Sequence, residues 1–205
     1  MRKPTIEPMD SYQTIKSDGQ SVLMRDRSEF LALTKRVDNP DDASRWIRLI
    51  KSEYKNATHH CSAYITGING EHQFYDDDGE PHGSAGRPIL GAMVSLEVTN
   101  LAVVVIRYYG GKKLGVRGLI DTYGEVAKMA IESSGIMMVT VSRDIEIVLL
   151  YKNVDRIHHL VKKHQAIILS ESFLLEVTMN IRISRNELDH FLELIQPFVL
   201  DVRID

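Results

Sequence analysis

The first part of the chain shows the apolar patterns of both strands and helices. Apolar and polar side chains alternate over residues 20–25 and 29–37, which predicts two strands joined by a turn at residues 26–28. Residues 38–54 instead place their apolar side chains on one helical stripe, behind an Asn-Pro pair that suits a helix start. This region therefore predicts a hairpin followed by an amphipathic helix.

The next part predicts a strand, a helix, a buried strand and a long helix. Residues 58–67 alternate like a strand, and residues 83–96 are typical of a short helix. The stretch 101–109, LAVVVIRYY, is apolar and β-branched almost throughout, which favours a central strand buried on both faces. A long helix is expected over residues 114–134, with Gly135 as its C-cap.

A second pattern begins near residue 137 and follows the order β-α-β-β-α-β. That order is typical of the ferredoxin-like split βαβ unit. The expected fold class is therefore α+β, with an α/β domain followed by a ferredoxin-like βαββαβ domain. The expected boundaries give an N-terminal extension (1–19), the α/β domain (20–135) and the ferredoxin-like domain (136–205).

Composition narrows the class of protein. The chain has 205 residues, of which 43% are hydrophobic, and a formal net charge of −3, as expected of a globular protein. Any nucleic-acid binding must therefore rest on a local basic patch. Cys61 is the only cysteine, so no internal disulfide can form. Because no apolar run could span a bilayer and residues 1–10 do not read as a secretory signal, a cytoplasmic protein without membrane contact is expected.

The segment 107–118, RYYGGKKLGVRG, combines glycines with cations. It leaves the expected buried strand, passes through Gly110 and Gly111, and enters the long helix. Glycines allow the backbone to approach a ligand closely, and free amides at a helix start attract anions. The P-loop and GxGxxG patterns are absent, so a phosphate cradle and a plain glycine turn both remain open. The cations of this segment are Arg107, Lys112, Lys113 and Arg117.

The segment 76–88, DDDGEPHGSAGRP, crowds four carboxylates around one glycine. Gly79 follows Asp76 too closely for a calcium-binding loop. A magnesium site stays open, because one or two carboxylates plus substrate phosphates can hold that ion. A tight turn is the preferred interpretation, since Asp-Gly favours turns and Asp side chains bond nearby amides. We expect an exposed acidic rim, with Arg87 paired to one of its carboxylates.

The His-His-Cys sequence at residues 59–61 invites a zinc or nucleophile interpretation. In a strand, His59 and Cys61 share one face while His60 points to the other. Zinc needs further ligands at recognisable spacings, and neighbours in a strand rarely meet as nucleophile and base. An ordinary buried thiol is therefore expected at Cys61.

Three sequence blocks resemble a known protein family. They are ATHHCSAY at 57–64, DDGEPHGSAGRP at 77–88 and RYYGGKKLGVRGLIDTYG at 107–124, in the order and separation of that family. On these blocks the chain resembles the IMPACT family (UPF0029), in particular its bacterial YigZ-like members.

The resemblance implies a fold and a role in translation. It implies an N-terminal α/β domain like those of a ribosomal protein and an elongation factor, followed by the ferredoxin-like domain of bacterial members. Both likenesses point to translation and RNA, and eukaryotic relatives regulate translation initiation. The resemblance implies no established enzymatic activity and no cofactor, so no catalytic or metal-binding residue is assigned.

The chain departs from the family pattern at four positions. His82 stands where a small Ser is usual, and Ser84 replaces a Thr. Arg117 replaces a glycine, and Asp121 replaces an arginine. The last two changes nearly cancel in charge, so the basic surface is expected to be shifted rather than lost.

The leading hypothesis is a non-enzymatic, translation-associated regulator that binds RNA or the ribosome through a basic, glycine-rich groove. A protein-interaction module without RNA contact, and a magnesium-dependent enzyme acting on a phosphorylated small molecule, are the alternatives. Tyr108 and Tyr109 could stack on bases, although one of them must face the core. The expected phosphate- or RNA-binding residues are Arg107, Gly110, Gly111, Lys112, Lys113 and Arg117. The motif loop comprises Asp77, Asp78, Gly79, Glu80, Pro81, Gly83 and Arg87, with His59 as a further motif residue.

Overall fold

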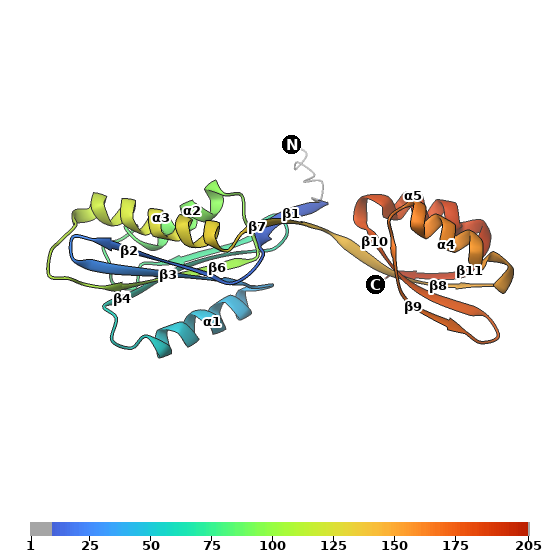
Figure 1. Cartoon of the computed structure of the whole chain (residues 1–205), viewed down its shortest axis with the longest axis horizontal. Coiled ribbons are helices and arrows are strands. Elements are labelled where there is room, and N and C mark those ends of the chain that lie inside the picture. Colours follow the sequence, from blue (N-terminus) through green and yellow to red (C-terminus); the bar gives the residue numbers. More distant parts are fainter. Residues whose placement is uncertain (1–9, 205) are drawn as a thin grey trace, which may run out of the picture. The chain divides into compact units, whose positions relative to one another are not determined.

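The computed structural model describes residues 10–204, which form two compact units (Figure 1). One unit is Ser11–Val139, and the other contains residues 140–204. The expected α/β domain (20–135) starts nine residues after the first unit does and ends four residues before it. The expected N-terminal extension (1–19) begins outside the described residues, and its last part contains strand β1 (Ser11–Ile15).

The first unit is built on a five-stranded antiparallel sheet with the order β2-β3-β6-β4-β5. Strand β1 lies outside this sheet and pairs with β7 (Ile136–Thr140). The strands of the main sheet are β2 (Gly19–Arg25), β3 (Ser28–Arg36), β4 (His59–Thr66), β5 (His72–Asp76) and β6 (Leu101–Tyr108).

The predicted hairpin at the start of this sheet is confirmed. Asp26 and Arg27 form its turn with φ angles of 47° and 68°, and Arg25 faces Ser28 across it. Two successive positive φ angles are the geometry of a turn whose twist matches that of the flanking strands. The turn therefore fixes the register of β2 against β3.

Three helices cover the two faces of this sheet. Helix α1 (Pro40–Glu53) lies on one face, and α2 (Gly86–Ser95) and α3 (Gly115–Ser133) lie on the other (Figure 1). The Asn39 side chain caps α1 by accepting a hydrogen bond of 2.9 Å from the Asp42 amide. Gly135, with a φ of 67°, follows α3 as predicted.

Strand β6 is the centre of the core. Its residues from Leu101 to Arg107 are all buried, because helices cover the sheet on both sides. Val103 and Val105 pack toward α2 and α3, whereas Val104 and Ile106 pack toward α1. The continuous apolar run therefore predicted this strand correctly.

Two strands of the first unit were not predicted. Strand β5 is an edge strand with mostly exposed side chains, so it lacks an alternating apolar pattern. Strand β1 is short and its first residues are polar. In addition, the single strand expected after residue 137 is two strands, since β7 pairs with β1 and β8 (Ser142–Leu149) belongs to another sheet.

The second unit has the element order β-α-β-β-α-β. Its antiparallel sheet has the strand order β11-β8-β10-β9, and its two α-helices pack on the apolar face of that sheet. Short 3₁₀ turns at Tyr151–Asn153 and Gln196–Phe198 precede α4 and β11. The remaining elements are α4 (Val154–Lys163), β9 (Ile167–Phe173), β10 (Val177–Ser184), α5 (Arg185–Ile195) and β11 (Val199–Ile204).

Among residues 10–204, the helices include none that is both long and apolar enough to cross a lipid bilayer.

Gly110 fixes the glycine-rich segment against the hairpin turn. A Cβ atom at this position would lie 1.9 Å from the carbonyl oxygen of Arg27, so no larger residue fits without a backbone shift. The Gly110 amide also donates to the Ser28 hydroxyl at 3.2 Å. The close approach that this glycine permits is therefore to the β2–β3 turn.

We predict that Gly110→Ala lowers the free energy of unfolding by about 2 kcal/mol or more, because of this backbone clash. Gly91→Ala is the matched control, since its Cβ would meet nothing within 4 Å and the residue lies inside α2. The control is expected to raise stability by about 0.5–1 kcal/mol. Urea unfolding measures both values, and equal effects of the two substitutions would contradict the assigned packing.

Candidate functional site

The acidic segment contains the predicted tight turn. Asp78 and Gly79 both have positive φ angles, 45° and 87°, and the Glu80 amide donates to the Asp77 carbonyl at 3.0 Å. This is the geometry of a turn with two left-handed central residues, which Asp-Gly favours. The turn interpretation of this segment is confirmed.

Asp77 organises the rest of the loop from the inside. Its carboxylate accepts hydrogen bonds from the amides of Gly83, Ala85 and Gly86 at 2.7, 3.1 and 2.8 Å. Only 12% of the Asp77 side chain is exposed. The expectation of an exposed acidic rim is wrong for this residue, because its carboxylate satisfies backbone donors at the start of α2.

Asp78 ties the same turn to α1. Its carboxylate accepts from the Lys51 ammonium at 2.8 Å and from the His60 amide at 2.7 Å. Burial opposes ionisation here, but these hydrogen bonds and the charge of Lys51 hold the pKa of Asp78 below its usual value. The carboxylate is thus a structural anion.

Glu80 forms the centre of a buried polar cluster. Its Oε1 atom accepts from Arg107 Nη1 at 2.6 Å and from the Tyr123 hydroxyl at 2.8 Å. The Glu80 and Arg107 side chains are only 4% and 6% exposed. The expected partner of the loop was Arg87, but that residue is exposed and makes no ion pair among the described residues; Arg107 takes this role because β6 carries it beneath the loop.

Strand register places the Arg107 guanidinium in the core. Phe30 and His59 are its direct neighbours on β3 and β4. The guanidinium lies 5.2 Å from the Phe30 ring centre and 5.3 Å from that of Tyr109. Arg107 Nη2 contacts the Ser28 hydroxyl at 3.4 Å, whereas its buried Nε finds no acceptor among the described residues. Arg107 is therefore a buried cation whose guanidinium is paired with Glu80 at the inner side of the loop.

The side chains of His59 and His60 lie on opposite faces of the sheet. His59 Nδ1 lies 2.8 Å from the Asp78 carbonyl oxygen, and His60 Nε2 lies 2.9 Å from the Tyr54 carbonyl oxygen on the α1 side. Cys61 Sγ donates to the Asp77 carbonyl at 3.1 Å. Cys61 is fully buried, so the expectation of an ordinary buried thiol is confirmed, and burial raises the pKa of this thiol well above its usual value.

An open hollow lies between the loop and the glycine-rich segment. It has a volume of about 420 Å³. Its polar side is formed by His59, Glu80 and Arg107, and its walls are mostly apolar. The other lining residues are Thr58, Pro81, Tyr109, Lys113, Leu114, Gly115, Val116 and Leu119.

The remaining cations of the segment differ in what they contact. Lys112 pairs with Asp26 at 2.5 Å, and Arg117 pairs with Asp121 at 3.2 Å, one turn further along α3. The two residues that depart from the family pattern therefore neutralise each other directly. Lys113 makes no ion pair with any residue in the described part of the chain, and it lines the hollow.

The first turn of α3 borders the same hollow. Gly115 begins the helix with a φ of 73°, and the preceding Leu114 provides no side-chain cap. The first amides of a helix lack intrahelical partners and carry the positive end of the helix dipole. Lys113 and this helix start together place positive potential at the edge of an apolar cavity.

The sequence left a magnesium site in the acidic segment open as an alternative to the turn. Its carboxylates are instead engaged by backbone amides, Lys51, Arg107 and Tyr123. Within residues 10–204, no group of three or more His, Cys, Asp or Glu side chains is placed to hold a metal ion.

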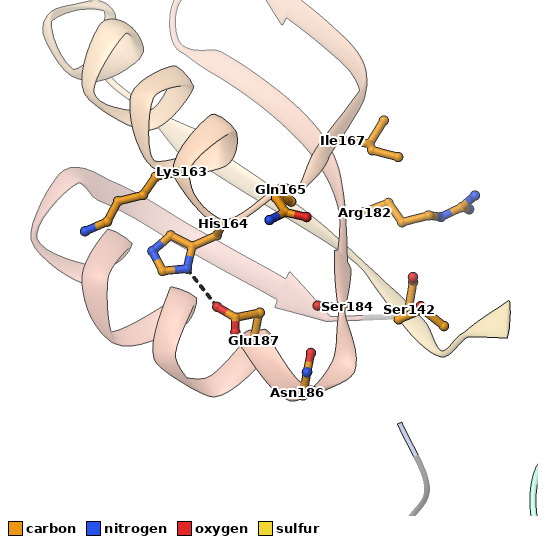
Figure 2. A pocket seen from close by; sticks show the side chains of 10 residues that line it. Ser142, Lys163, His164, Gln165, Ile167, Arg182, Ser184, Asn186 and Glu187 are labelled. Carbon is orange, nitrogen blue, oxygen red and sulfur yellow. Dashed lines mark hydrogen bonds and ion pairs between the residues drawn. The ribbon is translucent and has the colours of Figure 1, made fainter. Parts of the chain in front are cut away.

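A second hollow, of about 460 Å³, lies in the second unit, where α5 begins (Figure 2). Arg182 is bound to Asp144 through two hydrogen bonds of 2.7 Å, which lower the pKa of that carboxyl. His164 Nδ1 lies 2.9 Å from Glu187, and Lys163 points away from the other labelled side chains (Figure 2). Two of the charged groups of this hollow therefore already have partners, and the first hollow is the stronger candidate.

Several residues of the candidate site were not assigned from the sequence. The sequence placed four of them only in a helix, although the block 107–124 contains them all: Leu114, Val116, Leu119 and Tyr123. The first three line the hollow, and Tyr123 donates to Glu80, because α3 packs across the end of β6. Of the two tyrosines, Tyr108 packs against α1, and Tyr109 is 43% exposed beside the hollow.

Comparison with known proteins finds a matching family model and several relatives of this chain. The family model of the Impact N-terminal domain matches residues 26–131. An IMPACT family member of Haemophilus influenzae is 32% identical over 171 residues, which span 80% of this chain and 81% of that protein. YvyE of Bacillus subtilis is 38% identical over 129 residues, which span 63% of this chain and 59% of that protein.

Two further comparisons concern a bacterial relative and a solved structure. YigZ of Escherichia coli is 36% identical over 100 residues, which span 48% of this chain and 49% of that protein. A crystal structure described as a hypothetical protein has a TM-score of 0.68 at 23% identity and covers 96% of this chain and 97% of its own, so it shows a shared fold. The domain match and the Haemophilus relative show that this chain belongs to the IMPACT family.

Proposed function

We propose that this chain is a non-enzymatic, translation-associated protein that binds single-stranded RNA at the hollow between the acidic loop and the glycine-rich segment. The carrying observation is Lys113, a cation without an ion pair in residues 10–204, on the wall of an apolar cavity of about 420 Å³. Membership of the IMPACT family supports the proposed association with translation.

The proposed contacts divide between phosphate and base. Lys113 and the free amides at the start of α3 attract a phosphate, as helix starts do. Tyr109, which is 43% exposed beside them, offers a ring on which a base can stack. The salt bridges of Lys112 and Arg117 are exposed, so they cost about 0–1 kcal/mol to exchange for phosphate contacts.

In this proposal the second unit is not the part that binds RNA. Its element order and its strand order β11-β8-β10-β9 support a ferredoxin-like domain, like those that accompany ribosomal-protein-type domains in translation factors. The open face of its sheet carries paired charges, such as Arg182 with Asp144 and Arg203 with Glu146. In residues 142–204 that face presents no aromatic platform for bases, so we assign RNA binding to the first unit.

A protein partner is the second candidate, and the hairpin between β9 and β10 favours it. Leu174 and Leu175 at its tip are 78% and 97% exposed, and Phe173 beside them is 52% exposed. The Tyr151 hydroxyl donates to the Leu174 carbonyl at 2.7 Å, which helps to hold the tip in place. Adjacent exposed apolar side chains on a supported turn are typical of contact surfaces.

We predict that Lys113→Ala weakens binding of a short single-stranded RNA of mixed sequence. The slope of log affinity against log KCl concentration should become shallower by about 0.7, because one phosphate contact is lost. Fluorescence anisotropy measures both quantities. Lys128→Ala is the control, since it removes the same charge about 20 Å further along α3. Identical slopes for the two variants would refute the assignment.

The second candidate makes a separate prediction. Changing Leu174 and Leu175 to serine should abolish a protein contact that withstands ribonuclease, while Lys113→Ala should leave it intact. Affinity capture of ribosomal and translation proteins from nuclease-treated lysate tests this difference. Equal capture by the wild-type chain and the double serine variant would remove the hairpin from consideration.

A further inference from the structure

We propose that the hollow selects guanine among the bases of single-stranded RNA. This inference rests on the proposed function and names the ligand of the same site. It follows from two side chains on the polar side of the hollow that can accept hydrogen bonds, His59 and Glu80, together with the charges around them.

His59 provides the first acceptor. Its Nδ1 atom lies 2.8 Å from the Asp78 carbonyl oxygen, which can only accept a hydrogen bond. In the neutral ring the proton is therefore on Nδ1, and Nε2 carries a lone pair. This Nε2 atom lies 3.9 Å from Glu80 Oε1, and both residues line the hollow.

Glu80 provides the second acceptor. Its Oε1 atom is occupied by Arg107 and Tyr123, at 2.6 and 2.8 Å. Its Oε2 atom receives no hydrogen bond from the residues that the structure describes, and Glu80 is one of the residues that line the cavity. The Glu80 carboxylate and the His59 imidazole thus stand close together, 3.9 Å apart at Oε1 and Nε2, and no hydrogen bond joins the two groups among the residues that the structure describes.

Among the RNA bases, guanine fits such a pair best. Its Watson–Crick edge presents two adjacent donors, the N1–H and the exocyclic amino group. Adenine and cytosine each place an acceptor next to the amino group, and uracil has a single N–H between two carbonyl oxygens. Each of these bases would bring an acceptor against the Glu80 carboxylate, which leaves two lone pairs facing each other.

The charges of the site favour a neutral donor over a cationic one. Arg107 already neutralises Glu80, and Lys113, which has no ionic partner in the part of the chain that the structure describes, adds a positive charge at the same hollow. A lysine or arginine from a protein partner would bring a further cation to a site that has no uncompensated anion. A neutral base joined to an anionic phosphate matches both the polar side and Lys113.

The size and walls of the hollow agree with this ligand. Its volume of about 420 Å³ falls within the range of about 300–1,000 Å³ that is typical of small-molecule sites. Tyr109, Leu114 and Val116 supply flat or apolar surface for a base. The ribose and phosphate would then lie toward the first turn of α3.

The test compares nucleoside monophosphates on the wild-type chain by isothermal titration calorimetry. We expect GMP to bind most tightly, IMP about tenfold more weakly because it lacks the amino group, and AMP more weakly still. No substitution is required, so the result does not depend on a variant that fails to fold.

One variant separates the roles within the site. Glu80→Gln keeps the size of the side chain but replaces one carboxylate oxygen by a donor amide, so it should remove the preference for GMP over IMP. Binding of mixed-sequence RNA should keep its dependence on Lys113. Thermal unfolding shows whether the Glu80→Gln variant still folds. If the variant does not fold, the comparison of nucleotides on the wild-type chain still tests the guanine preference.

The outcomes distinguish this inference from the function on which it rests. Equal affinities for GMP, IMP and AMP, with RNA binding that still depends on Lys113, would overturn the guanine preference alone. Absence of binding for every nucleotide and for RNA would overturn both. Saturable binding of N-acetyl-arginine methylamide, with none of GMP, would overturn the inference in favour of a protein side chain.

Discussion

The site depends on one buried interaction, in which the Glu80 carboxylate joins the acidic loop to the sheet and to a helix. Oε1 accepts from Arg107 on β6 and from Tyr123 on α3, and both ionic side chains are almost fully buried. A buried ion pair gains little net stability by itself, but removing one partner leaves an uncompensated charge in the core. The pair therefore specifies where the loop lies, and the hollow exists because the loop is held there.

The glycines and carboxylates of the two segments serve this same arrangement. Gly110 permits contact with the β2–β3 turn, and Asp77 and Asp78 bind amides and Lys51 instead of facing solvent. Most of the charged side chains of the two segments thus make internal contacts that hold the segments together. The hollow between the segments has mostly apolar walls, the neighbouring His59 and Glu80, and Lys113, which makes no ion pair within residues 10–204; on our proposal this is a more selective surface than a basic groove.

Much of the fold could be predicted from the sequence, because periodicity reports burial directly. The buried strand β6, the stripe of α1 and the Asp26-Arg27 turn each follow from local chemistry. Strand β5 could not be predicted, since an edge strand needs no alternating pattern. The site was predicted only in outline: both segments were identified, but which arginine reaches Glu80 depends on strand register, and register is a property of the assembled sheet.

The most direct test of the account is the backbone amide spectrum of nitrogen-15-labelled protein during titration with a short single-stranded RNA containing guanine. A ligand in the hollow should shift the amides of Tyr109, Gly115 and Val116 first, because these residues line it. Residues 140–204 should change little. Shifts confined to the second unit, or none at Gly115 and Val116 at saturation, would contradict the assignment of the hollow as the RNA site.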